Sequence, residues 1–154
     1  MFHDQSPQSI RKDNDMYKNI IAGYDGSDRS MRAVEEAADL ATAVGANLHL
    51  VSAVDKQNKI HEFGESSDKI FLSDVQIAEE NLNTIASQYA HLNVTTTAVP
   101  GAPARVLLDQ AADTKADLIL VGNRHVQGIS RVLGSVAEDI AHKAPCAVLV
   151  AKTA

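Results

Sequence analysis

A strand, a turn and the start of a helix are predicted by the sequence Tyr17-Lys-Asn-Ile-Ile-Ala-Gly23-Tyr-Asp25-Gly-Ser-Asp28. Its apolar centre is short and uninterrupted, as in a strand that is covered on both faces. Apolar residues then recur at steps of three and four from Met31 to Val44, which indicates one buried helical face. Ser27 or Asp28 is placed to cap the amino end of this helix, and Gly45 to close its carboxyl end.

The rest of the chain repeats this alternation of strands and helices. A polar segment, 55–67, is predicted to be a mobile loop. Four further apolar strands are predicted, at Asn47–Val54, Val94–Val99, Asp117–Gly122 and Cys146–Ala151. Three further helices are predicted, from Phe71 to Tyr89, from Pro103 to about Ala112, and from a capping box that begins at Ser135.

This pattern predicts an α/β fold, a three-layer sandwich around a five-stranded parallel sheet. Right-handed crossovers from a central first strand give the strand order 3-2-1-4-5. We expect residues 16–154 to form a single domain and residues 1–15 to be a disordered tail. A chain of 154 residues with 45% apolar and 22% charged residues suits one globular domain.

Composition argues against several classes of function. The net charge is −6, from 14 basic and 20 acidic residues, so phosphate-rich nucleic acids and anionic membranes should repel the chain. No apolar run reaches the roughly 18–20 residues of a membrane helix, and the first residues lack a signal-peptide core. One cysteine and six scattered histidines predict neither a disulfide framework nor a protein-bound metal. We therefore expect a cytoplasmic protein.

The candidate site follows from the strand order. Ligands of open parallel sheets bind beyond the carboxyl ends of the strands where the order reverses, here between the first and fourth strands. Two glycine-containing turns follow those strands, at 23–27 and 122–128, and the second continues toward a helix that starts near Ser135. Backbone N–H groups there favour phosphate, and Arg124 and Arg131 add positive charge. Asp25 is placed to accept ribose hydroxyls.

A structural reading of the same residues stays open beside the functional one. Gly23, Gly26 and Gly122 can simply permit tight turns, and Ser135 can simply cap its helix. The common alternatives fail by spacing, because the chain has no G-x-G-x-x-G after its first strand, no Walker motif and no G-x-S-x-G elbow. No nucleophile–base pair is evident, so no catalytic residue is predicted.

Five motifs resemble those of the universal stress proteins, over nearly the whole length from Tyr17 to Ala151. They are Asp25-Gly-Ser27, Val99-Pro-Gly-Ala-Pro103, Ala116-Asp-Leu-Ile-Leu-Val-Gly122, Gly134-Ser-Val-Ala-Glu138 and Ala144-Pro-Cys-Ala-Val-Leu-Val150. The resemblance implies a Rossmann-like fold of the adenine nucleotide alpha hydrolase type. It also implies the nucleotide-binding branch of the family, with one departure: His125 stands where that branch has a glycine, in a spacer one residue shorter.

The resemblance implies a nucleotide-binding role for particular residues. Asp25 matches a ribose or adenine position, and Ala53 matches a backbone contact to adenine. Gly122, Gly134 and Ser135 match ribose and phosphate contacts, while Arg124 and Gly128 are added from the chemistry of the loop. The expected ligand is ATP or an AMP-type nucleotide, with Mg²⁺ or Mn²⁺ carried on its phosphates.

Three functions remain open on the sequence. The first is a stress-response module that senses an adenine nucleotide and is at most a slow ATPase. The second is a nucleotide-free universal stress protein that acts through protein contacts, and the third is a nucleotide-using enzyme of the same fold. The fifth strand, uncharged until Lys152, is expected to lie at a sheet edge and to pair with its copy in a homodimer, as the resemblance also implies.

Overall fold

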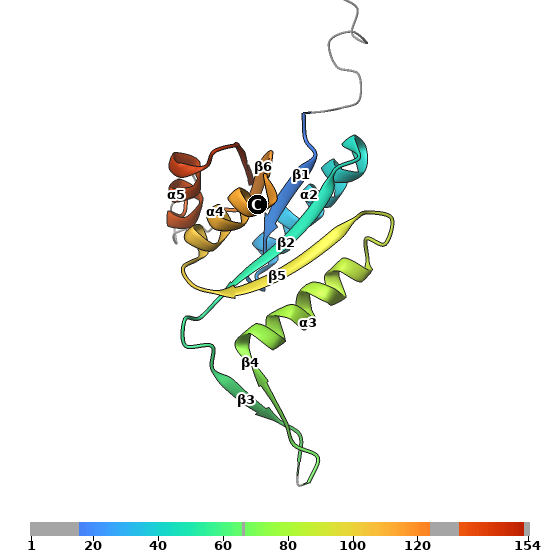
Figure 1. Ribbon diagram of the computed structural model, residues 1–154, viewed down its shortest axis with the longest axis vertical. Helices are drawn as coiled ribbons and strands as arrows, with labels where there is room; N and C mark the ends of the chain where they lie inside the picture. The colour runs from blue at the N-terminus through green and yellow to red at the C-terminus, as the bar shows by residue number, and fades with distance from the viewer. Residues whose placement is uncertain (1–15, 66, 124–132, 153–154) are drawn as a thin grey trace, which may run out of the picture.

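The computed structural model describes residues 16–65, 67–123 and 133–152. Its main sheet is parallel throughout and has the order β5-β2-β1-β6-β7 (Figure 1), which is the predicted order 3-2-1-4-5. Both the α/β class and the five-stranded parallel sheet are therefore confirmed. The strands are β1 (Asn19–Gly23), β2 (Asn47–Val54), β5 (Val94–Pro100), β6 (Leu118–Gly122) and β7 (Ala147–Ala151).

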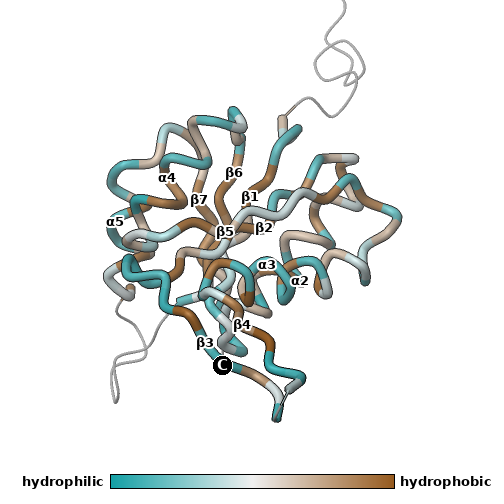
Figure 2. Tube along the Cα trace, turned by 60° about the horizontal axis from the view of Figure 1, so that its bottom comes forward, coloured by the Kyte–Doolittle hydropathy of each residue, from teal (hydrophilic) through white to brown (hydrophobic). Residues whose placement is uncertain are grey.

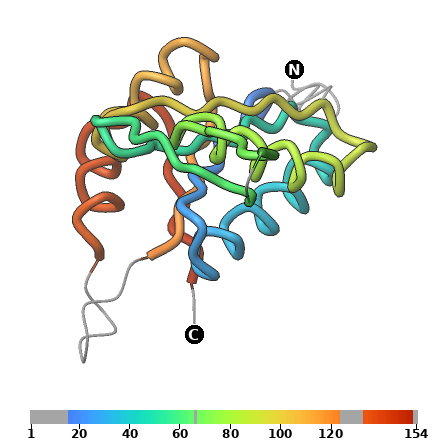
Figure 3. The backbone as a smooth tube through the Cα atoms, turned by 90° about the horizontal axis from the view of Figure 1, so that it is seen from below, coloured from blue at the N-terminus to red at the C-terminus, as the bar shows by residue number. Residues whose placement is uncertain are grey.

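Helices cover both faces of this sheet (Figures 1 and 3). On one face, α2 (Asp28–Val44) and α3 (Asp74–Ser87) share a core with Ile20 and Ala22 of β1. On the other face, α4 (Pro103–Thr114) and α5 (Ser135–Lys143) share a core with Ile21. Successive residues of β1 are therefore buried on opposite faces, which explains why its sequence is apolar without a break.

The two ends of α2 are closed as the sequence predicts. The side chain of Ser27 accepts a hydrogen bond from the N–H of Ser30 at 3.1 Å, and Gly45 adopts the left-handed conformation with φ 74°. The helix predicted near Ser135 is present as α5, but the capping box predicted for it is wrong. Its N-cap is Gly134, and no side chain of the described residues caps it. Ser135 lies one residue too late, because it is already the first residue of the helix.

The polar segment 55–67, predicted as a loop, contains the first strand of a second, two-stranded sheet, and the other strand follows it. Strands β3 (Ile60–Phe63) and β4 (Ile70–Ser73) pair antiparallel and project from the main sheet (Figure 1). Phe71, predicted to start the next helix, belongs to β4 instead. The helix α3 begins only at Asp74, because Ser73 and Gln76 form a reciprocal capping box at this point. Neither Ile-His-Glu-Phe nor Ile-Phe-Leu-Ser alternates apolar and polar residues, so the sequence gives no strand signal for these two short segments.

None of the helices in the described ranges is long and apolar enough to cross a membrane. The outermost strands of the main sheet are β5 and β7. These are the third and fifth predicted strands, which the predicted order also places at the two edges.

Candidate functional site

A pocket of about 110 Å³ opens at the carboxyl ends of β1, β2 and β6, where the strand order reverses. This is the place that the topology of an open parallel sheet predicts. Its wall is mostly apolar and comes from strand ends and helix starts. The lining residues are Gly23, Tyr24, Asp25, Ser27, Arg29, Ser30, Val51, Ala53, Pro103, Leu107, Val121, Gly122 and Val136.

The structure brings three of the predicted site residues together in this pocket: Asp25, Ala53 and Gly122. Gly134 and Ser135 lie at the start of α5, whose second residue, Val136, lines the same pocket. Arg124 and Gly128 lie outside the described residues, as do His125 and Arg131.

The turn between β1 and α2 is held by its own side chains. Oδ1 of Asp25 accepts hydrogen bonds from the N–H of Ser27, at 2.9 Å, and from the Ser27 hydroxyl. The N–H of Asp25 in turn donates to Oγ of Ser30 at 3.1 Å. Ser52 adds a link from β2, since its hydroxyl donates to the carbonyl of Tyr24 at 2.8 Å. Asp25 is thus a structural residue of the turn as well as a pocket residue.

Gly122 has a steric reason to be glycine. A Cβ at this position would lie 2.7 Å from the carbonyl oxygen of Arg29 and 3.2 Å from the N–H nitrogen of Ser30. Backbone atoms of the first turn of α2 cannot move aside as the end of a flexible side chain can. The end of β6 therefore packs directly against the start of α2, and this close approach is part of the pocket wall.

Three helix starts converge on the pocket, because first-turn residues of α2, α4 and α5 line it: Arg29, Pro103 and Val136. Each helix start carries a partial positive charge and N–H groups without a partner inside the helix. For α4 and α5 no side chain supplies that partner among the described residues, whereas Ser27 caps α2. The amide of Gly134 donates to Oδ1 of Asn123 at 2.9 Å, which ties the start of α5 to the end of β6.

A second hollow of about 250 Å³ adjoins the first and shares Tyr24, Asp25 and Ala53 with it. Asp55 and Asp74 add two more carboxylates to its border. The pKa of Asp74 lies below its usual value, chiefly because His61 hydrogen-bonds the carboxylate. This side of the site is therefore anionic, in contrast to the side formed by α5.

Sequence reasoning missed the apolar part of the wall and most of the helix residues in it. The apolar pattern of the sequence marks Val51, Leu107 and Val121 as core residues. Only their place toward the end of a strand or the start of a helix distinguishes these pocket residues from the rest of the core. The first turns of α2 and α4 could have been found from the rule that such turns face the carboxyl edge of a parallel sheet.

Metal ligation and thiol chemistry find no support in the described residues. Across 16–65, 67–123 and 133–152, no three His, Cys, Asp or Glu side chains gather as a metal site. Burial, with a smaller contribution from Asp117, raises the pKa of Cys146, which keeps the thiol protonated at neutral pH. Cys146 packs in the α4–α5 core and does not line the pocket.

Comparison with known proteins gives the family. Residues 16–152 match the model of the universal stress protein family. The chain is 36% identical over 148 residues to universal stress protein Rv1636 of Mycobacterium tuberculosis, covering 89% of this chain and 97% of the relative. It is 31% identical to universal stress protein MJ0531 of Methanocaldococcus jannaschii, over 93% of this chain and 86% of that one.

Solved structures agree with this assignment. A universal stress protein crystallised in complex with cAMP superposes with a TM-score of 0.68 and is 30% identical, with 90% of this chain and 98% of that chain covered. The chain belongs to the universal stress protein family. The resemblance in the sequence motifs is thereby confirmed.

Proposed function

We propose that this universal stress protein binds an adenine nucleotide in the pocket between β1, β2 and β6, and acts as a regulatory module rather than as a fast enzyme. One observation carries the proposal: the first turns of three helices converge on a pocket that also holds an apolar wall and the carboxylate of Asp25. Apolar surface, hydroxyl acceptors and a positive end are the three features that a nucleotide requires.

Each part of the pocket suits one part of the ligand. The apolar side chains of Val51, Leu107 and Val121 suit the purine base, next to the backbone of Ala53. The carboxylate of Asp25 suits ribose hydroxyls, because a carboxylate accepts up to about four hydrogen bonds and can combine local bonds with ligand bonds.

The charges of the two hollows orient the ligand. Phosphates are repelled from the hollow bordered by Asp25, Asp55 and Asp74. They are attracted to the start of α5, where no side chain of the described residues occupies the first N–H groups. A nucleotide therefore points its phosphates toward Gly134 and Ser135. Arg124 and Gly128 stay predicted contacts within the segment 124–132, and Mg²⁺ or Mn²⁺ would be carried by the phosphates of ATP.

The relative in complex with cAMP supports an adenine nucleotide as the ligand class. ATP and AMP-type nucleotides remain the ligands that the sequence favours. A histidine at position 125 adds a side chain where the binding branch has none, and we expect weakened rather than abolished affinity for phosphates.

A second candidate, a nucleotide-free interaction module, has one observation in its favour. The fold alone explains two of the motif residues. Asp25 holds the β1–α2 turn through its bonds with Ser27, and a Cβ at Gly122 would clash with Arg29. Their presence alone therefore does not require a ligand. Only a binding measurement separates the two candidates.

The test has two parts. Purified protein is denatured, and the released small molecules are identified by chromatography and mass spectrometry. ATP, AMP and cAMP are then titrated calorimetrically into the stripped protein and into the His125→Gly variant. We expect an adenine nucleotide to bind, and His125→Gly to bind ATP more tightly. Neither released nucleotide nor measurable binding of any of the three ligands would favour the interaction module.

The proposal includes a homodimer through β7. This strand lies at an edge of the sheet, and Leu149 is 36% exposed there. Unpaired N–H and C=O groups along such an edge invite a second strand, and a two-fold axis closes the assembly. Sedimentation is the measurement, and Leu149→Lys on β7 should convert the dimer to a monomer.

A further inference from the structure

The β3–β4 hairpin, residues 60–73, gathers most of the large exposed apolar side chains of the described chain. Ile60 is 72% exposed, Ile70 and Phe71 are 59% exposed, and Phe63 is 47% exposed. Figure 2 shows these hydrophobic segments on strands that project from the body. A cluster of exposed apolar side chains on one short element indicates an interaction site.

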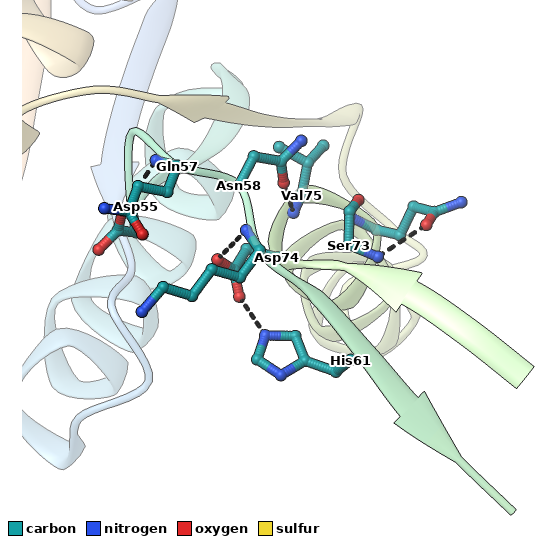
Figure 4. A network of polar contacts seen from close by, with 9 residues as sticks. Asp55, Gln57, Asn58, His61, Ser73, Asp74 and Val75 are labelled. Atoms are coloured by element: carbon teal, nitrogen blue, oxygen red, sulfur yellow. Dashed lines mark hydrogen bonds and ion pairs between the residues drawn. The ribbon is translucent and has the colours of Figure 1, made fainter.

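The hairpin is a positioned element, because a polar network fixes its base to α3 (Figure 4). The N–H of Lys59 donates to Oδ2 of Asp74 at 2.9 Å, and the N–H of Asp74 donates to the carbonyl of Lys59 at 2.8 Å. His61 adds a contact of 2.7 Å to the other carboxylate oxygen of Asp74, and Oδ1 of Asn58 accepts from the N–H of Val75 at 2.9 Å. An isolated hairpin is marginal in water, so this network keeps the apolar side chains presented in one geometry.

The register places apolar side chains on both faces of the hairpin. Phe63 lies opposite Ile70 on one face, and Phe71 lies opposite Glu62 on the other. Stacking of one face against a partner would leave the other face exposed. Pairing along an edge brings side chains of a partner strand alongside on both faces at once.

The two edges of the hairpin differ in charge. β3 carries His61 and Glu62, whereas β4 reads Ile-Phe-Leu-Ser and carries no charge. Charged residues protect an edge strand from pairing, and β4 has none. In the main sheet β4 has no partner strand, since the described residues pair it with β3 alone.

Charge also selects the partner. The whole chain has a net charge of −6, but the segment 56–73 is neutral. Its charged residues are Lys56, Lys59 and Lys69 against Glu62, Glu65 and Asp68. A strongly basic or acidic partner gains no electrostatic attraction there, whereas two neutral hairpins meet without like-charge repulsion at the contact itself.

We propose that β4 pairs antiparallel with β4 of a second copy of this chain, to form a four-stranded sheet across a two-fold axis. An axis through Phe71 places this residue opposite its own copy and Ile70 opposite Leu72 of the other chain, so each face gains apolar pairs. The surface is distinct from β7, which lies at the edge of the main sheet remote from β5. A strand of four residues is small against the roughly 800 Å² per partner of a standard interface, so the contact is weak and depends on concentration.

The full-length chain is sedimented over a wide range of protein concentrations, with Phe71→Lys and Phe71→Glu as variants. Each variant places two like charges opposite one another at the axis, and we expect it to lose the increase in mass that the parent shows at high concentration. A mixture of the two variants places Lys opposite Glu, and we expect it to recover the parental mass. A loss of folding cannot produce this recovery.

Ile60→Lys is the matched control, because it removes an exposed apolar residue of the same hairpin from the other edge. We expect it to keep the parental mass. Equal masses for the parent and both Phe71 variants, no recovery in the mixture, or a loss with Ile60→Lys as large as with Phe71→Lys would each overturn the proposal. So would flotation of the parent with phosphatidylcholine vesicles at unchanged mass, since the occupant would then be a membrane.

Discussion

The start of α2 and the start of α5 border the same pocket, but the described residues cap the two helices differently. In the first, Asp25, Ser27 and Ser30 bond one another and cap the helix. In the second, no described side chain caps α5, and the amide of Gly134 donates to Oδ1 of Asn123. A helix start that caps itself needs no ligand, whereas an uncapped one leaves N–H groups to bind an anion. Under the proposed function, the first helix start mainly builds the pocket, and the start of α5 is the part expected to bind phosphate.

The largest effect on stability is expected at Gly122, where the end of β6 packs against the start of α2. In Gly122→Ala, the new Cβ would lie 2.7 Å from the carbonyl oxygen of Arg29, so β6 and α2 must separate. We expect a loss of about 1–3 kcal/mol in the free energy of unfolding, measured with denaturant, together with weaker nucleotide binding. Gly23→Ala is the control, since its Cβ meets only side-chain atoms, of Leu107 at 3.1 Å and of Val121 at 3.6 Å. An equal loss for both variants would contradict the steric role of Gly122.

Next in size is the effect of Asp25 on binding. Asp25→Ala removes a charged acceptor from the proposed ribose contact, which should weaken ATP binding by about 1–3 kcal/mol in calorimetry. It also removes two local hydrogen bonds with Ser27, so the melting temperature should fall modestly.

Asp25→Asn separates these two roles. Its amide oxygen still accepts from Ser27 and holds the turn, but the negative charge is gone. We expect the melting temperature of Asp25→Asn to stay close to that of the parent while ATP binds more weakly. Unchanged affinity in both variants would leave Asp25 with a structural role alone.

A pair of serines tests the contrast between the helix starts. Ser27→Ala removes the cap of α2 and should cost about 1 kcal/mol of folding stability with little effect on nucleotide affinity. Ser135→Ala removes no cap, because Ser135 is exposed in the first position of α5. It should leave stability unchanged and weaken ATP binding. A loss of stability in Ser135→Ala and none in Ser27→Ala would contradict the difference between the two helix starts.

The sequence predicts the main sheet well because each of its strands is a continuous apolar run between turn residues. The strand Asn47–Val54 is found at its exact bounds, and the order follows from the handedness of crossovers. The pocket lining is predicted only where a motif residue lies at the end of a strand or just after it, as at Asp25, Ala53 and Gly122.

Two features escape the sequence for physical reasons. Whether Ser135 caps its helix depends on one residue of register, and a helix can begin at either side of Gly134. The hairpin escapes because its stability comes from contacts of Lys59, Asn58 and His61 with the start of α3, which are made only after folding. The composition of the segment itself does not predict such contacts.

The smallest expected effect is a pH dependence of folding stability that comes from His49. His49 lies on β2 at the end of the sheet remote from the pocket, where Asn19 and Thr95 hydrogen-bond its ring. Burial lowers its pKa below the ordinary value of about 6.5, so the unfolded chain binds the proton more readily. Stability should therefore be complete above about pH 6.5 and decrease as the pH falls through the lower pKa of the folded state.

Melting temperatures between pH 8 and pH 5, taken for the parent and His49→Gln, measure this effect. We expect the curve of His49→Gln to be flatter in this window. Titrations of ATP over the same pH range check that the effect is confined to folding. His49 lies remote from the pocket, so the affinity for ATP should have the same pH profile in His49→Gln as in the parent. A changed pH profile of affinity, or an unaltered pH profile of stability, would contradict this role of His49.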